Sequence, residues 1–168
     1  QKEKTPHTRL LGAGDTLHGL PIANTDKGDI VVTMMNEIGE SYMTTGNHGY
    51  NYGMERLLEL GKEAKFKILA ANVYKDGKRV FTPYVIQDVQ GVRVAFFGLA
   101  TPETAYKADP KLVAGVTFTD PIVEGRAIAN ELAGQYDVLV LISHIGTDKS
   151  SDPTSIKVAQ AIPELDVI

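Results

Sequence analysis

The sequence contains no cysteine. The chain can therefore form no disulfide and no thiolate metal site, and a metal ion would have to be bound by Asp, Asn, His or backbone oxygen. Both cytosolic proteins and many exported bacterial proteins share this absence, so it leaves the compartment open.

The sequence also lacks an excess of basic residues and a long apolar run. Its 17 Lys and Arg against 21 Asp and Glu give a net charge of −4, which argues against a binder of nucleic-acid polymers or of membrane surfaces. A small phosphorylated substrate remains possible, because bound metal ions hold a phosphate without a basic patch. No apolar run has the length of a membrane span. The first residues, Gln1–Lys4, do not have the pattern of a signal peptide.

What is present is an alternation of strand-like and helix-like segments over the length of one domain. Apolar runs predict strands at 9–11, 41–45, 66–74, 80–89, 92–99 and 138–142, with a further strand from residue 166. Apolar residues at helical spacing predict helices at 30–38 and 54–61, and Asp-Pro pairs predict helix starts at 120–121 and 152–153. The alternation predicts a layered α/β domain with a mixed sheet.

Local signals add detail to this prediction. Asp29 has the side chain of an N-cap for the first of these helices, and Gly39 is typical of its end. The Asp-Gly pair at 76–77 and the Gln-Gly pair at 90–91 are typical of two-residue turns, so we expect an antiparallel hairpin inside the domain. The run 138–142 is apolar at every position, as expected for a strand covered on both faces.

Polar residues follow three of the predicted strands. Asp15 follows the first strand in a glycine-rich loop, Asn47 and His48 follow the second, and His144 follows the buried strand near the end of the chain. In α/β sheets, ligands gather outside the carboxyl ends of the strands. We therefore expect these four residues to converge at one edge of the domain.

Each of these residues also has a purely structural interpretation. Asp15 could cap its own backbone in a turn, and Asn47 and His48 could be solvated turn residues. His144 could be a hydrogen-bonded core residue, although imidazole is also the commonest nitrogen ligand of first-row metals. Their shared position after strand ends favours the functional interpretation.

Two further interpretations concern the same loop and the remaining histidines. The glycines before the loop aspartate suggest a dinucleotide-binding turn, but Leu17 stands where that pattern needs its third glycine. His7 and His18 have no comparable setting, and we interpret both as solvated or loop-packing residues.

Several segments, in this order, resemble the 5'-nucleotidase family of the calcineurin-like metallophosphoesterases. They are Gly14–Pro21, Gly46–Gly53, Ala71–Tyr74 and Ser143–Gly146, and Phe97–Thr104 is similar as well. The resemblance covers nearly the whole chain. It implies the layered catalytic domain of that family and hydrolysis of phosphate esters of nucleotides.

The resemblance implies a role for each candidate residue. Asp15 would bridge two divalent metal ions, and Asn47 and His144 would bind the second ion. His48 would be the catalytic histidine beside the phosphoryl group, with Asn51 as its hydrogen-bond partner. The attacking group would be a hydroxide activated by the two ions, whose identity (Mn, Zn, Mg or Ca) the sequence leaves open.

The chain departs from the family pattern at two positions. Gly49 stands where the family has Glu or Asp after Gly-Asn-His. Asn51 stands where 5'-nucleotidases often have an aspartate that orients the catalytic histidine, so it could accept a hydrogen bond but could not stabilise an imidazolium by charge. Relatives that act on 2',3'-cyclic nucleotides resemble the chain at this position, so both substrate classes stay open.

The first motif of the family, Asp-x-His, would lie before Gln1, and its last, Gly-His-x-His, would follow Ile168. We therefore expect residues 1–168 to be a catalytic domain truncated at both ends, without the first strand, the last metal-binding motif and the C-terminal substrate-binding domain. Such a fragment would be inactive alone and would self-associate through an uncovered sheet edge. Family members are mostly exported to the periplasm, cell wall or cell surface. The alternative is a non-catalytic descendant that acts as a binding or interaction module, which Gly49 and Asn51 favour.

Overall fold

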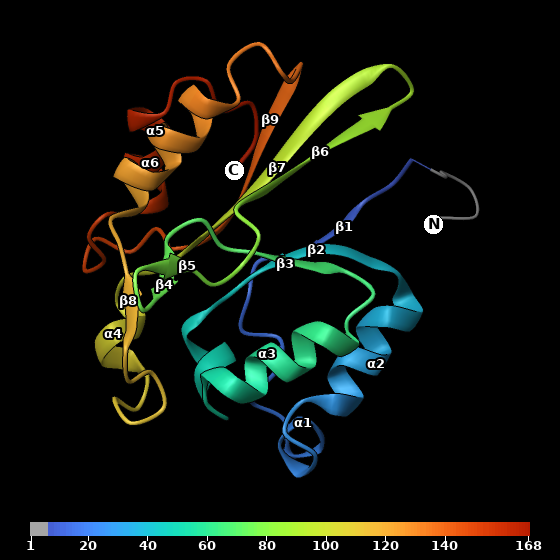
Figure 1. The fold of residues 1–168 in the computed structure, drawn as a ribbon, viewed down its shortest axis with the longest axis vertical. Helices are drawn as coiled ribbons and strands as arrows, with labels where there is room; N and C mark the ends of the chain where they lie inside the picture. The colour runs from blue at the N-terminus through green and yellow to red at the C-terminus, as the bar shows by residue number, and fades with distance from the viewer. Residues whose placement is uncertain (1–6) are drawn as a thin grey trace.

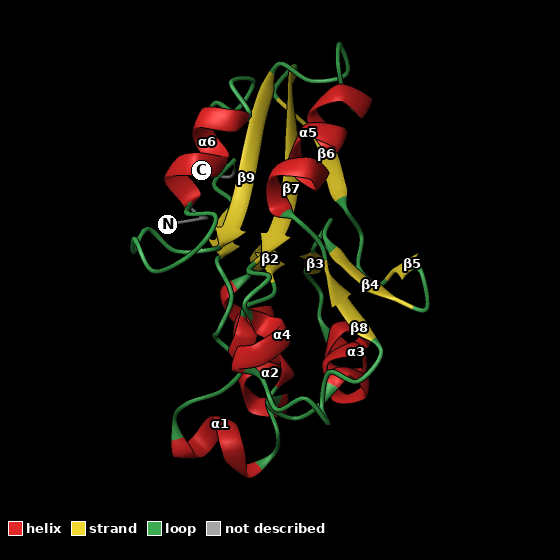
Figure 2. Ribbon diagram, turned by 90° about the vertical axis from the view of Figure 1, so that its left-hand side faces the viewer, coloured by secondary structure: helices red, strands yellow, loops and turns green. Residues whose placement is uncertain are grey.

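The computed structural model, which describes residues 7–168, is built in layers. Two sheets pack face to face, and helices cover the outer side of each (Figures 1 and 2). Apolar clusters fill the spaces between sheet and sheet and between each sheet and its helices. The layered α/β fold with mixed strand directions and an internal hairpin is therefore confirmed.

The first sheet is parallel, and its helices follow its strands along the chain. Its strands are β1 (Leu10–Gly12), β2 (Glu40–Thr44) and β3 (Lys67–Leu69), in that order. The short helix α1 (Pro21–Thr25) and the helix α2 (Asp29–Ile38) lie between β1 and β2, and α3 (Met54–Glu63) lies between β2 and β3.

The second sheet combines a hairpin with a parallel neighbour. Its strands are β6 (Tyr84–Val89), β7 (Val92–Ala100) and β9 (Val138–His144); β6 is antiparallel to β7, and β9 is parallel to β7. The helices α5 (Pro121–Glu131) and α6 (Ser155–Ala161) lie beside this sheet (Figure 1). A small third sheet contains β4 (Val73–Lys75), β5 (Lys78–Arg79) and β8 (Val116–Phe118), and α4 (Thr104–Lys107) precedes β8.

The single strand expected at 66–74 is wrong, because the structure divides this segment between two sheets as β3 and β4. The side chain of Asn72 explains the division. It is fully buried, and it donates to the carbonyl of Ala100 (2.8 Å) and accepts from the N–H of Ala100 (2.9 Å). These bonds replace the strand ladder at this point and turn the chain toward the small sheet.

One predicted helix start and one predicted N-cap are also wrong. The helix expected from the Asp-Pro pair at 152–153 begins at Ser155, because Thr154 is the N-cap and its hydroxyl accepts from the N–H of Lys157. Asp29 lies inside α2 instead of capping it. The side chain of Asp26 accepts the free N–H groups at that end.

Other boundaries shift by a few residues. The helix α3 continues past Gly61 to Glu63, and the strand expected at 80–89 begins at Tyr84. The expected strand from residue 166 forms a single bridge, between Val167 and Val140. By contrast, the Asp120 cap and both two-residue turns are confirmed, since the residues at 76–77 and 90–91 all have positive φ.

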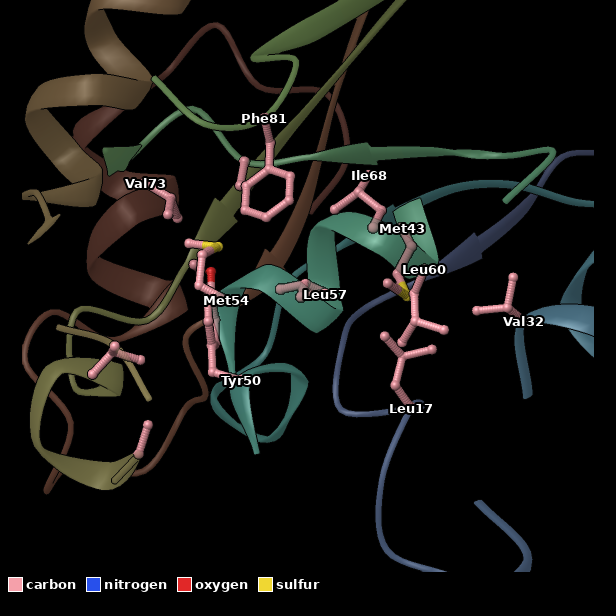
Figure 3. Close-up of a cluster of buried hydrophobic side chains, with 14 of the residues drawn as sticks. Leu17, Val32, Met43, Tyr50, Met54, Leu57, Leu60, Ile68, Val73 and Phe81 are labelled. Atoms are coloured by element: carbon pink, nitrogen blue, oxygen red, sulfur yellow. The ribbon is translucent and has the colours of Figure 1, made fainter. Parts of the chain in front are cut away.

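The cluster between the first sheet and its helices anchors the loops at the end of that sheet (Figure 3). Leu17, in the loop after β1, is 2% exposed, and Tyr50, in the turn after β2, is fully buried. The Tyr50 hydroxyl donates to Thr45 Oγ1 (3.1 Å), and burial raises its pKa. Buried side chains therefore anchor both loops to the core, because their removal would expose a large apolar surface.

An apolar groove of about 820 Å³ runs along β9. Its lining includes Leu11, Val140, Ile142, Ile156, Val167 and Ile168. Several of these side chains are a third to a half exposed. Among the helices of residues 7–168, none is long and apolar enough to cross a membrane.

Candidate active site

The loops after β1 and β2 and the end of β9 meet at one edge of the domain. The N–H of His48 donates to Asp15 Oδ1 (2.8 Å), and His144 Nε2 lies 3.1 Å from Asp15 Oδ2. Asn47 and His144 line the same cavity. The convergence expected for these four residues is therefore present, while their chemical roles remain predictions.

The backbone around Asp15 is shaped to bring its carboxylate against the loop after β2. Asp15 has a φ of 60° and Gly14 a φ of 90°, both in the left-handed region. Gly46 faces this carboxylate so closely that an added Cβ would lie 2.1 Å from Asp15 Oδ1. Gly46 is therefore required by space, and it lets the first loop approach the second.

The proton on His144 is placed by the backbone. His144 Nδ1 lies 2.6 Å from the carbonyl oxygen of Ala13, and a carbonyl can only accept, so Nδ1 carries a proton. His144 Nε2 therefore faces Asp15 Oδ2 either with a second proton or with a lone pair. Two lone pairs 3.1 Å apart repel each other unless a proton or a metal cation lies between them.

The electrostatics of this pair follow from the same contact. The hydrogen bond to Asp15 raises the pKa of His144, and burial of the ring opposes this effect. Burial would raise the pKa of Asp15, but the hydrogen bonds from His144 and from the His48 N–H outweigh it, so the pKa is lowered. In the absence of metal, the pair is therefore biased toward imidazolium and carboxylate.

The donor set fits one edge of a metal site. Two ligands at right angles, each about 2.1 Å from an ion, are about 3 Å apart, which matches the separation of His144 Nε2 and Asp15 Oδ2. A metal-binding imidazole commonly donates its other N–H to a carbonyl, as His144 does to Ala13. Within residues 7–168, however, no group of three or more His, Cys, Asp or Glu is placed to hold an ion. Asn47 is therefore needed to complete even a three-ligand set.

His48 belongs to a polar group that the sequence interpretation only partly recognised. Asn51 Nδ2 lies 3.0 Å from His48 Nδ1 and 3.0 Å from His18 Nδ1. The amide nitrogen of Asn51 thus donates to His48, and Asn51 contacts the histidine whose hydrogen-bond partner the resemblance implies it to be. His18 packs in its loop, as one of its two expected interpretations has it, and its ring contacts Tyr52 and is also stacked on that of His48. His7 is exposed, as expected.

A cavity of about 380 Å³ opens beside the pair of Asp15 and His144. Its lining includes Asn47, His144, Thr101, Glu103, Lys107 and Ser151. Glu103 is 7% exposed, and Lys107 Nζ lies 2.5 Å from its carboxylate. The hydrogen bond from Lys107 lowers the pKa of Glu103. Neither residue was predicted to belong to the site, because a Glu and a Lys four residues apart are common on helix surfaces and the burial of Glu103 depends on tertiary packing.

Comparison with known proteins identifies relatives of the chain. No family model matches the chain. The 5'-nucleotidase of Vibrio cholerae is 32% identical to it over 170 residues, which cover 95% of this chain and 31% of the relative. The chain thus spans about a third of that curated relative.

Solved structures show the same relationship. The calcineurin-like phosphoesterase YfkN from Bacillus subtilis superposes with a TM-score of 0.86 at 26% identity, over 99% of this chain and 58% of that chain. The NAD nucleotidase of Haemophilus influenzae superposes with a TM-score of 0.80 at 30% identity, over 94% of this chain and 28% of that chain. The chain belongs to the 5'-nucleotidase family of calcineurin-like phosphoesterases.

Proposed function

We propose that the chain is the central part of the catalytic domain of a metal-dependent phosphohydrolase whose substrates are 5'-nucleotides or 2',3'-cyclic nucleotides. The observation that supports this proposal is the proton placement on His144. The Ala13 carbonyl holds the Nδ1 proton, so that Nε2 and the Asp15 carboxylate face each other as a pair of donors for a cation. Relatives of this chain are named as nucleotidases.

Asp15, Asn47 and His144 would hold a divalent ion through a carboxylate oxygen, an amide oxygen and an imidazole nitrogen. Such an ion would supply positive charge to a phosphoryl oxygen and would make bound water a better nucleophile at neutral pH. The His48 backbone N–H fixes the orientation of the Asp15 carboxylate by bonding its second oxygen. The protein thus orients the donors before any ligand arrives.

His48 provides the proton chemistry in this proposal. Its Nδ1 accepts from the Asn51 amide, so its remaining proton is on Nε2, and the residue is exposed. An exposed Nε2–H is able to donate a hydrogen bond to a phosphoryl oxygen or to the leaving group.

The structure gives no support to a non-catalytic binding module. That alternative rested on Gly49 and Asn51. Asn51 contacts the His48 ring directly, and a Cβ added at Gly49 would meet only Leu57 Cδ2 at 3.9 Å.

We further propose that residues 1–168 alone are inactive. The three donors above are too few for two ions, because two close divalent charges repel strongly and one bridging carboxylate does not offset that repulsion. The apolar groove along β9 exposes surface that a longer chain would cover and that a second copy would cover in its absence. An exported location is part of the proposal, and it rests on the family resemblance.

Titration calorimetry with manganese, combined with phosphate-release assays on 5'-AMP and on 2',3'-cyclic AMP, tests these proposals. For residues 1–168 we expect weak binding of at most one ion and no turnover. For a form extended to the length of the relatives we expect turnover. In both forms, Asp15→Asn should weaken manganese binding at least about tenfold, because it removes the charged donor.

The matched control is Asp137→Asn, which removes a carboxylate at the other end of β9 and should leave manganese binding unchanged.

Sedimentation of the same samples measures self-association. Tight binding of two ions with turnover by residues 1–168 would show that we have misplaced the ligands. An extended form that releases no phosphate from either nucleotide would refute the proposed activity.

A further inference from the structure

Two imidazoles in the site share one amide. The side-chain nitrogen of Asn51 lies 3.0 Å from Nδ1 of His18 and 3.0 Å from Nδ1 of His48. An amide nitrogen has two protons to donate and accepts no hydrogen bond, so both Nδ1 atoms act as acceptors. In a neutral ring that accepts at Nδ1, the single proton is on Nε2, so the shared amide favours the same tautomer in both rings.

The position of His18 is built by its surroundings. Its ring is nearly parallel to that of His48, with an angle of 8° between the planes and 5.6 Å between the centroids. The Tyr52 ring is tilted against the His18 ring, with 5.4 Å between the centroids. The Tyr52 hydroxyl donates to Asn24 Oδ1 (2.6 Å), and the same oxygen accepts from the N–H of the residue after His18. Contacts with α1 thus hold the His18 loop and the Tyr52 ring together.

We propose that His18 is a positioning residue, which acts through Asn51 to fix the tautomer of His48. With His48 alone, the amide could present either its nitrogen or its oxygen, and the His48 tautomer would change with each flip. With two rings on the same amide nitrogen, a flip is favourable only if both rings move their protons to Nδ1 together. A flip with one ring unchanged places two acceptors or two donors against each other.

As a consequence, the Nε2–H tautomer of His48 is favoured more strongly than it would be by Asn51 alone. A change of the His48 tautomer alone would cost the hydrogen bond between Asn51 and His18, and one bond of ordinary strength shifts the ratio of the two tautomers roughly fivefold. The proposal also gives Asn51 a reason to be an amide. A carboxylate at this position accepts only and would require Nδ1–H on both rings. The role of His48 in catalysis rests on the proposed function, whereas its tautomer does not.

Nuclear magnetic resonance of the histidine rings tests the proposal. The chain has four histidines, so two-bond ¹H–¹⁵N correlations from ¹⁵N-histidine-labelled protein are assignable by single substitutions. At about pH 8.5, above the ordinary pKa of imidazole, we expect His18 and His48 both to show the Nε2–H pattern. In His18→Phe, which keeps an aromatic ring for stacking, we expect a roughly fivefold larger Nδ1–H fraction on His48.

Asn51→Asp provides a second, independent measurement. We expect both His18 and His48 to change to the Nδ1–H pattern in this variant. His144 should keep its proton on Nδ1, where it donates to the Ala13 carbonyl. His7→Phe is the matched control, because His7 is exposed and contacts Gln90 instead of the site, and it should change neither ring. If His18→Phe is not folded by its amide spectrum, the Asn51→Asp result alone decides.

An Nδ1–H pattern on His48 in the unsubstituted protein would overturn the proposal. So would an unchanged His48 tautomer in folded His18→Phe, or a change of only one ring in Asn51→Asp. In an active extended form, His18→Phe should lower kcat and leave KM nearly unchanged. If no extended form hydrolyses nucleotides while the ring patterns follow expectation, the proposed function fails and the positioning role stands.

Discussion

An aspartate with a lowered pKa lies beside each end of β9, and the two aspartates differ in how their charge is balanced. At the start of the strand, Asp137 binds Arg93 through both carboxylate oxygens (2.7 and 3.1 Å) and accepts from the Arg93 backbone N–H (2.8 Å). At the other end, Asp15 faces His144 (3.1 Å) and the backbone N–H of His48 (2.8 Å). Only the first partner carries a permanent charge.

This difference separates a structural carboxylate from a candidate ligand. The bonding capacity of Asp137 is filled by a fork of donors that needs neither a proton nor an ion. Asp15 is paired with a ring whose outer nitrogen faces it without a fixed proton, so the contact is complete only with a proton or a cation between them. A contact between half-buried groups whose proton a cation can replace suits a ligand site, whereas the donors of Arg93 leave no such place at Asp137.

The largest effect is expected from a single methyl group at the Asp15 end. In Gly46→Ala, the new Cβ would lie 2.1 Å from Asp15 Oδ1, so the carboxylate must leave its place against His48 and His144. The backbone of Gly46 is extended and suits alanine, so the loss is due to space alone. We expect manganese affinity, measured by calorimetry, to fall more than tenfold.

Gly49→Ala is the matched control for this substitution. It lies three residues away, and its Cβ would make only an ordinary contact with Leu57 at 3.9 Å. We expect it to keep manganese affinity within about twofold, because it touches no donor. Equal losses in the two variants would mean that the loop, and not the approach to Asp15, controls the site.

A smaller effect is expected at the wall of the cavity. Lys107 is paired with the buried Glu103 and faces the space that Asn47 and His144 line, so its charge is close to where a phosphate would lie. Lys107→Met should weaken binding of inorganic phosphate to the manganese-loaded protein roughly two- to fivefold, since a half-exposed cation contributes little. Lys157→Met, on α6 and paired with Asp152, is the control. No difference between the two variants would remove Lys107 from the phosphate site.

The sequence predicted where the candidate site lies, but not all of the contacts among its side chains. Glycine-rich turns after apolar strands place Asp15, Asn47, His48 and His144 at one edge, because parallel strands end together. The contacts of His18 with Asn51 and His48 were not predicted, because its loop is placed by contacts with Tyr52 and Asn24 that no periodicity encodes. Donor and acceptor roles at an amide likewise depend on tertiary contacts.

The same limit explains the errors in the fold. The apolar run at 66–74 has the composition of one strand, and only the pairing of Asn72 with the Ala100 backbone divides it. Asp-Pro at 120–121 caps a helix and Asp-Pro at 152–153 does not, because the hydroxyl of Thr154 takes that place. Several neighbouring side chains are able to cap the same helix, and tertiary packing determines which of them does so.

The smallest effect is expected at the Arg93 end of β9, and it depends on pH. The hydrogen bonds from Arg93 lower the pKa of Asp137 to about 2, from an ordinary value of 3.8. Because the folded-state pKa is the lower one, this aspartate stabilises the fold fully above pH 3.8, and the contribution is lost as the pH falls toward 2. Asp137→Asn should therefore lower Tm by at most a few degrees at pH 6, and the difference should disappear near pH 2.

Thermal unfolding followed by circular dichroism between pH 2 and pH 6 measures this difference. Asp76→Asn, which removes a charge in the turn between β4 and β5, is the control and should give no such pH-dependent gap. A gap for Asp137→Asn that persists at pH 2 would mean that the substitution disturbs packing and not charge. No gap at pH 6 would mean that the exposed pair of Asp137 and Arg93 adds nothing measurable to stability.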